Sequence, residues 1–102
     1  NTVEISDDDK HIKLTDQNKN EIVMNSSGIS LSSAKDITLK AKGAITIEAT
    51  SKINATAKQD VSLEGLNVKM EAKVSATVKG NAKAELSASG QTTVKGAMVM
   101  IN

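Results

Sequence analysis

The chain contains no Cys, Pro, Phe, Tyr or Trp among its 102 residues, and all 13 of its basic residues are Lys. Without Cys it can form neither a disulfide nor a thiolate zinc site. Without aromatic rings or Arg, and with a formal net charge of +1, it lacks the basic stripe and stacking surfaces that nucleic-acid binding requires. We therefore expect no nucleic-acid partner. The longest apolar run, 97–101, is far shorter than the ~20 residues of a membrane-spanning helix.

Bulky apolar side chains are also scarce. Hydrophobic residues make up 38% of the chain, and many of them are Ala. A single domain of this length buries only about 60% of the surface that its unfolded chain exposes, which makes it marginally stable. We therefore expect something other than a private core to hold the chain together. Because the sequence starts at Asn1 without Met, we also expect it to be part of a longer protein.

The sequence does contain a repeat of about eight residues. Pairs of apolar residues separated by one polar residue recur along the chain, and from Ile29 onward they recur every seven or eight residues. Two positions after each of these pairs stands a small residue, such as Ala41, Ala49 or Gly65. Two or three mostly polar or flexible residues then precede the next pair. The unit is therefore apolar-x-apolar-x-small, followed by a corner.

Strict alternation predicts β-strands, because successive side chains of a strand point to opposite faces. The polar residues within the strands, such as Thr38, Lys40 and Glu48, are then expected on the solvated face. Segment 72–88 is rich in Ala, Lys and Glu and raises the alternative of a helix. Its apolar residues alternate instead of recurring at the spacing of a helix face. We therefore predict an all-β chain.

Eight residues are too few for a complete solenoid turn, so each repeat is expected to form one face of a three-sided prism. Either one chain winds three successive repeats around the axis, or three identical chains intertwine. The trimer is favoured because no capping repeat is visible. The predicted fold is an intertwined homotrimeric triple-stranded β-helix, shaped as a triangular prism. The residues predicted to line its axis are Ile29, Leu31, Ile37, Leu39, Ile45, Ile47, Ile53, Val61, Leu63, Val68, Met70, Val78, Leu86 and Val94.

Four of the repeats, ITLKAKGA (37–44), ITIEATSK (45–52), VSLEGLN (61–67) and VKMEAKVS (68–75), carry a family resemblance. They resemble the C-terminal triple-stranded β-helix of spikes of contractile injection machines, namely the VgrG proteins of type VI secretion and their phage-tail relatives. Segment 11–49 is similar to the part of the family that leads into the needle. The ending VKGAMVMIN (94–102) is similar to members whose apolar apex receives a PAAR-type tip protein.

This resemblance implies a membrane-puncturing spike that is assembled in the bacterial cytoplasm and then driven across the envelope to the outside. It divides the chain into lead-in strands (1–28), a regular β-helix (29–96) and an apex (97–102). The family's preceding oligosaccharide-binding-fold domain and hub region are not in this sequence. The implied partners are two further copies of the chain, the target envelope transiently, and a tip protein. The residues expected to bind the tip protein are Ala97, Met98, Val99, Met100, Ile101 and Asn102.

No residue pattern points to catalysis, a cofactor or a metal. His11 is the only His, and alternation places it on the polar face beside Ile12, so we expect a solvated surface residue. The His-x-His motif of some iron-tipped phage spikes is absent. Segment 7–9 (Asp-Asp-Asp) lacks the Gly and the closing Glu of a calcium loop and is expected to be a turn. No nucleophile has an activating base, so we expect the protein not to be an enzyme.

Other functions remain open on the sequence alone. The chain could be a β-solenoid stalk or adhesin module that displays a binding surface. It could also be the spike of a phage tail or of an extracellular injection particle. Ice binding and functional amyloid are weaker alternatives, because the outward positions carry Lys and Glu as often as Thr and the corners are regular.

Overall fold

Four β-strands form in the first third of the chain, where alternation of apolar and polar residues predicted them: β1 (Thr2–Ser6), β2 (His11–Thr15), β3 (Glu21–Asn25) and β4 (Gly28–Ser32). The computed structural model describes all 102 residues as two units, Asn1–Asn54 and Ala55–Asn102. The chain is all-β and contains no helix, also in segment 72–88, which confirms the predicted structural class. None of it forms a helix with the length and hydropathy needed to cross a membrane.

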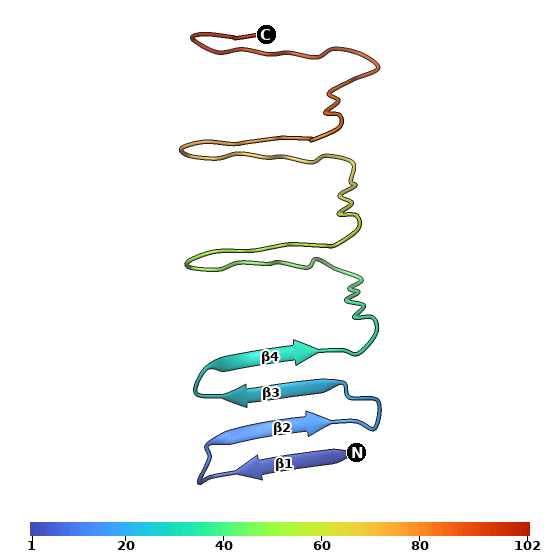
Figure 1. The fold of residues 1–102 in the computed structure, drawn as a ribbon, viewed down its shortest axis with the longest axis vertical. Coiled ribbons are helices and arrows are strands. Elements are labelled where there is room, and N and C mark those ends of the chain that lie inside the picture. Colours follow the sequence, from blue (N-terminus) through green and yellow to red (C-terminus); the bar gives the residue numbers. More distant parts are fainter. The chain divides into compact units, whose positions relative to one another are not determined.

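The four strands make one antiparallel sheet in the order β1-β2-β3-β4 (Figure 1). Each strand is therefore hydrogen-bonded to the strand that precedes it in the sequence, and every connection reverses the chain. The predicted boundary between residues 28 and 29 lies at the start of β4. The division into lead-in, repeat and apex remains a prediction.

The three reversals of the chain contain all of its residues with positive φ. Lys10 (φ 51°) ends the turn between β1 and β2, Lys19 (φ 70°) lies between β2 and β3, and Gly28 (φ 125°) begins β4. The left-handed backbone of such residues allows tight reversals that ordinary strand geometry does not. The turn predicted at residues 7–9 is confirmed: it spans 7–10, and the Asp9 amide donates to Ser6 Oγ over 3.1 Å.

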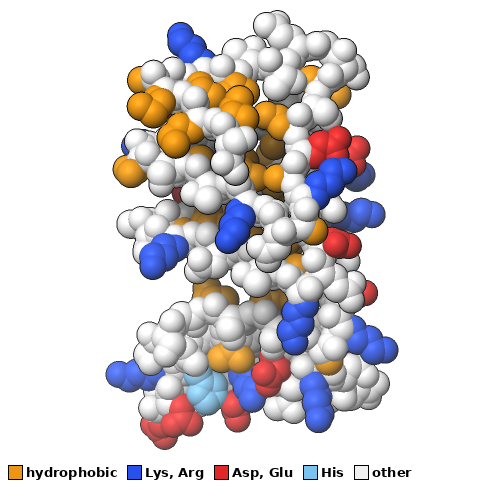
Figure 2. Space-filling view, turned by 45° about the horizontal axis from the view of Figure 1, so that its top comes forward, with side chains coloured by type: hydrophobic (Ala, Val, Ile, Leu, Met, Phe, Trp, Pro, Cys, Tyr) orange, Lys and Arg blue, Asp and Glu red, His pale blue; other side chains and the backbone are white.

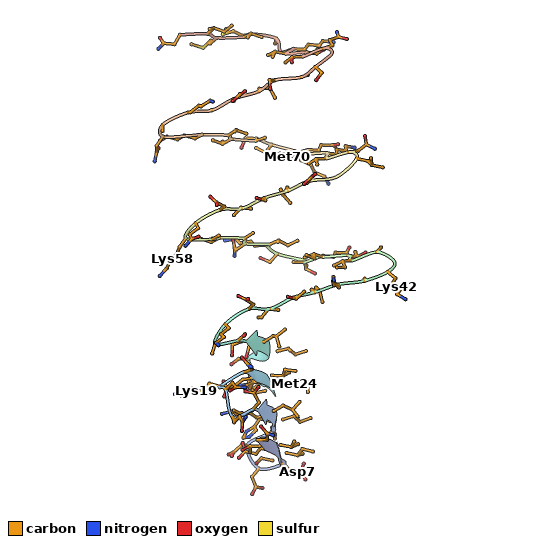
Figure 3. All side chains as sticks on the ribbon, turned by 90° about the vertical axis from the view of Figure 1, so that its right-hand side faces the viewer. Asp7, Lys19, Met24, Lys42, Lys58 and Met70 are labelled. Carbon is orange, nitrogen blue, oxygen red and sulfur yellow. The ribbon has the colours of Figure 1, made fainter.

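After β4 the chain changes character. It bends at a regular interval of about eight residues, and each bend comes directly after the small residue of a repeat. The bends lie at 34–35, 42–43, 50–51, 58–59, 66, 73–74, 81–82, 89–90 and 97–98. Lys42 and Lys58 mark two of these corners in Figure 3. The predicted corners are therefore confirmed. The repeat that begins at Val61 has seven residues, and its bend consists of Leu66 alone.

The extended segments between these bends have no partner within the chain. Backbone–backbone hydrogen bonds occur in the sheet and in the loop between Asp16 and Asn20, and none involves residues 33–102. Within the second unit, the backbone runs as an open coil whose turns are not joined to one another (Figure 1). Buried backbone groups in folded proteins are almost always paired. This part of the chain thus has the geometry of strands but none of their pairing.

The chain also has no core. No side chain, apolar or polar, is buried, and the accessible surface is 11109 Å². A folded monomer of 10.7 kDa exposes about 5,500 Å² and its unfolded chain about 15,500 Å². The observed surface is therefore about twice that of a folded monomer. The excess is comparable to the area that obligate subunits bury against one another.

Gly80 is the glycine at which the backbone approaches itself most closely. A Cβ at this position would overlap the carbonyl oxygen of Lys83 and lie 2.8 Å from its carbonyl carbon. We predict that Gly80→Ala lowers the stability of the folded protein by about 1–3 kcal/mol per chain, because the corner at 81–82 must open. Gly90→Ala is the matched control, since a Cβ there meets nothing within 4 Å. Thermal unfolding of both variants should show a loss only for Gly80→Ala, and equal midpoints would contradict it.

Candidate functional site

The apolar pairs of the four strands form two continuous rows across one face of the sheet. The strand register places each pair directly opposite the next. The first row is Val3, Leu14, Ile22 and Leu31, and the second is Ile5, Ile12, Met24 and Ile29. Met24 projects from one side of the sheet in Figure 3, where the strands are seen nearly edge-on. Cross-strand neighbours of this kind stabilise a sheet when something covers them.

Nothing within the chain covers these rows. The side chains of the inner strands β2 and β3 are 36–40% exposed, and those of β1 and β4 are 60–77% exposed. The first row and Ile37 line an open hollow of about 500 Å³ in the first unit. Hydrophobic side chains stand open at the surface in Figure 2. Contiguous apolar surfaces that include two rows of side chains are typical of interaction sites.

The other face of the sheet is polar and more closely packed. Lys13 Nζ lies 3.2 Å from Glu21 Oε1, and His11 Nε2 lies 2.6 Å from Glu4 Oε2. His11 is on the polar face, as predicted. Its side chain is only 21% exposed, however, because it contacts Glu4 diagonally across the β1–β2 pair. Sequence reasoning missed this contact, and it needs the pairing of the two strands to be known.

The repeats after β4 continue the same division between apolar and polar positions. The side chains predicted to line the axis are between 47 and 80% exposed, whereas Leu66 and Val74, which lie in bends, are fully exposed. On the polar positions, Lys69 Nζ lies 3.1 Å from Glu71 Oε2 and Lys83 Nζ lies 2.9 Å from Glu85 Oε2. Each of these pairs joins two residues of the same extended segment. Such exposed pairs contribute little to stability.

The loop between β2 and β3 is hydrogen-bonded to the first corner after β4, where the chain leaves the sheet. The carboxylate of Asp16 accepts hydrogen bonds from the amides of Asn18 and Asn20 and from Asn20 Nδ2, each over 2.9 Å. Asn20 Oδ1 accepts in turn from the amide of Ala34 over 3.0 Å, at the first corner. We call Asp16, Asn20 and Ala34 the exit anchor. Nothing in the sequence pattern indicated it, because the two ends are 18 residues apart and the loop conformation brings them together.

The predicted apex consists of a corner and a short extended segment. Ala97 and Met98 form the last bend, which places Met98 in a corner. Met98 is 77%, Met100 85% and Ile101 90% exposed. No group of three or more His, Asp or Glu side chains could hold a metal ion. The main feature that the structure offers is therefore an exposed apolar surface.

Comparison with known proteins adds no assignment. No family model matches the chain, and no curated protein matches it. Function must therefore be argued from the exposed apolar rows and the unpaired repeats.

The exit anchor predicts a dependence of stability on pH. Hydrogen bonds from the amide and side chain of Asn20 hold the pKa of Asp16 below the ordinary value of 3.8, since they favour the carboxylate. Their stabilisation is present above pH 3.8 and is lost as the pH falls through the lower pKa of the folded state. An NMR titration should place the Asp16 midpoint below 3.8, and Asp16→Asn should reduce the loss of stability in acid. A midpoint at or above 3.8 would contradict this account.

Proposed function

We propose that the chain is one of three identical strands of a rigid, noncatalytic needle that a contractile injection machine drives through a cell envelope. The observation that carries this proposal is the combination of regular corners and missing hydrogen bonds in residues 33–102. A chain that bends after every strand completes one turn of a three-sided prism in about 24 residues. Two further copies then supply the strands between its turns, which lie about 14 Å apart at the spacing of paired strands.

A single-chain solenoid would have a different hydrogen-bond pattern. Its successive turns would pair directly, so that segment 61–65 would bond to segment 84–88 in the second unit. The chain makes no such bonds. Pairing between copies satisfies the backbone groups and covers the apolar side chains in one step, which supports the trimer over a monomeric stalk.

A needle of this kind would be stiff and polar outside. Every layer would be joined to the next by main-chain hydrogen bonds, and no corner in residues 33–102 is longer than a few residues. The axis would be filled by the apolar pairs from Ile29 to Val94. Lys and Glu on the outer positions would keep the surface hydrated during passage through lipid, since surfaces without an apolar face do not anchor in a membrane interface. Such a needle would be assembled in the bacterial cytoplasm and then exported across the envelope.

The trimer is tested by its mass and by one charged substitution. Native mass spectrometry should give about three times 10.7 kDa. Ile45→Asp should abolish the trimer, because three carboxylates would meet in a dry interior, where each unpaired charge costs several kcal/mol. Thr46→Lys, one residue along and on the outer face, is the control and should assemble normally. A monomeric wild type, or full trimer yield from Ile45→Asp, would overturn the proposal.

The exposed residues Ala97–Asn102 are proposed to receive a PAAR-type tip protein at the apex of the needle. Flexible Met side chains adapt well to a partner surface. The double substitution Met98→Lys and Met100→Lys should leave the trimer intact and abolish binding of the cognate tip protein, measured by calorimetry. Thr93→Lys, on the outer face of the preceding repeat, should bind normally. Unchanged tip affinity in the double variant would show that the apex is not the docking surface.

A further inference from the structure

Strand β4 has a free edge that its own chain leaves unpaired. Gly28–Ser32 pairs with β3 on one side, and β4 ends the sheet on the other. The next extended segment, 37–41, makes no backbone hydrogen bond. An open strand edge is a template for another strand. Here a strand with one free edge is followed in the sequence by an unpaired extended segment of equal length.

The exit anchor keeps these two segments from pairing within one chain. The amide of Ala34 is held by Asn20 Oδ1, and the amide of Lys35 donates to Ser33 Oγ over 3.1 Å. The backbone therefore bends at Ala34–Lys35 and continues past the edge of β4. A hairpin at this place would instead return the chain to that edge. No residue of this corner has positive φ, unlike the three places where the chain does reverse.

The edge of β4 and segment 37–41 match in sequence. A shift of eight residues places Ile29 beside Ile37 and Leu31 beside Leu39, so both apolar rows of the sheet continue without a break. The same shift places Ser30 beside Thr38 on the polar face. Copies related by rotation about a common axis, as in the trimer proposed above, run parallel at this edge.

We propose that the free edge of β4 receives residues 37–41 of a second copy in parallel, and that this contact sets the register of the whole assembly. The proposal rests on the trimer proposed above. The repeats after β4 are so alike that a slip by one repeat would cost only one layer of pairing. The antiparallel sheet occurs only once in each chain. Its edge is therefore the one place where a shifted register leaves a specific strand without its partner. Poorly specified register is the usual failure of repetitive strands.

Cysteine cross-linking tests this contact in the full chain, which has no Cys of its own. Directly opposed residues of paired strands lie about 4.8 Å apart, within the Cα separation of a disulfide. Oxidation of the double variant S30C/T38C should give a covalent trimer on a non-reducing gel, because each chain is linked to the next around the axis. The matched control S30C/T46C, displaced by one repeat, should give no covalent trimer.

The cross-linking results distinguish failure of the register contact from failure of the proposed trimer. A native trimer in which S30C/T38C gives no covalent trimer, or in which S30C/T46C cross-links equally, overturns the register contact and leaves the trimer standing. A monomeric protein overturns both. Adding Asn20→Ala should release the anchor and let the two segments pair within one chain, so that the covalent trimer from S30C/T38C falls. Asn25→Ala, which removes an acceptor for the Ser27 amide in the β3–β4 turn, should leave that trimer unchanged.

Discussion

The structure depends on one constraint, which is that each backbone amide and carbonyl of an extended chain needs a partner. The first 32 residues meet it within the chain except at the outer edges of β1 and β4, since three reversals return each strand to the previous one. The following residues repeat the same strand pattern but end each strand with a small residue and a bend. A chain that turns a corner does not return to its own edge. Its backbone groups must therefore be paired by water or by other chains.

The missing core follows from the same geometry. A sheet or strand that has apolar residues on one face must bury that face against another layer. The chain reverses only within one sheet and then turns corners, so it provides no second layer. Hence the two rows on the sheet and the paired apolar residues of the repeats are all exposed. Intertwined copies would satisfy the backbone and the apolar faces together. In the proposed trimer, this coupling would hold together a chain that has no aromatic residue and many Ala residues.

The local features of the fold were predictable because they have local causes. Alternation at Ile12, Leu14, Ile22 and Met24 predicted strands with one apolar face, and the small residue before each corner predicted the bends. The turn at 7–9 was predictable, but the antiparallel pairing that it produces was not. Two of the three reversals depend on Lys10 and Lys19 with positive φ, which Lys rarely adopts. The contact of His11 with Glu4 and the exit anchor were missed for a related reason, since both join residues that only the folded hairpins bring together.

The sequence by itself determined the structural class, the period of eight and the side of each strand that is apolar, because side-chain direction in a strand is fixed by parity alone. Only the tertiary structure decided which strands pair within the chain and which do not. That choice depends on the φ angles of a few connecting residues and on one Asn that holds the first corner. These are properties of the backbone conformation. Apolar residues alternate with polar ones both before and after the end of β4, so alternation alone does not decide which strands pair.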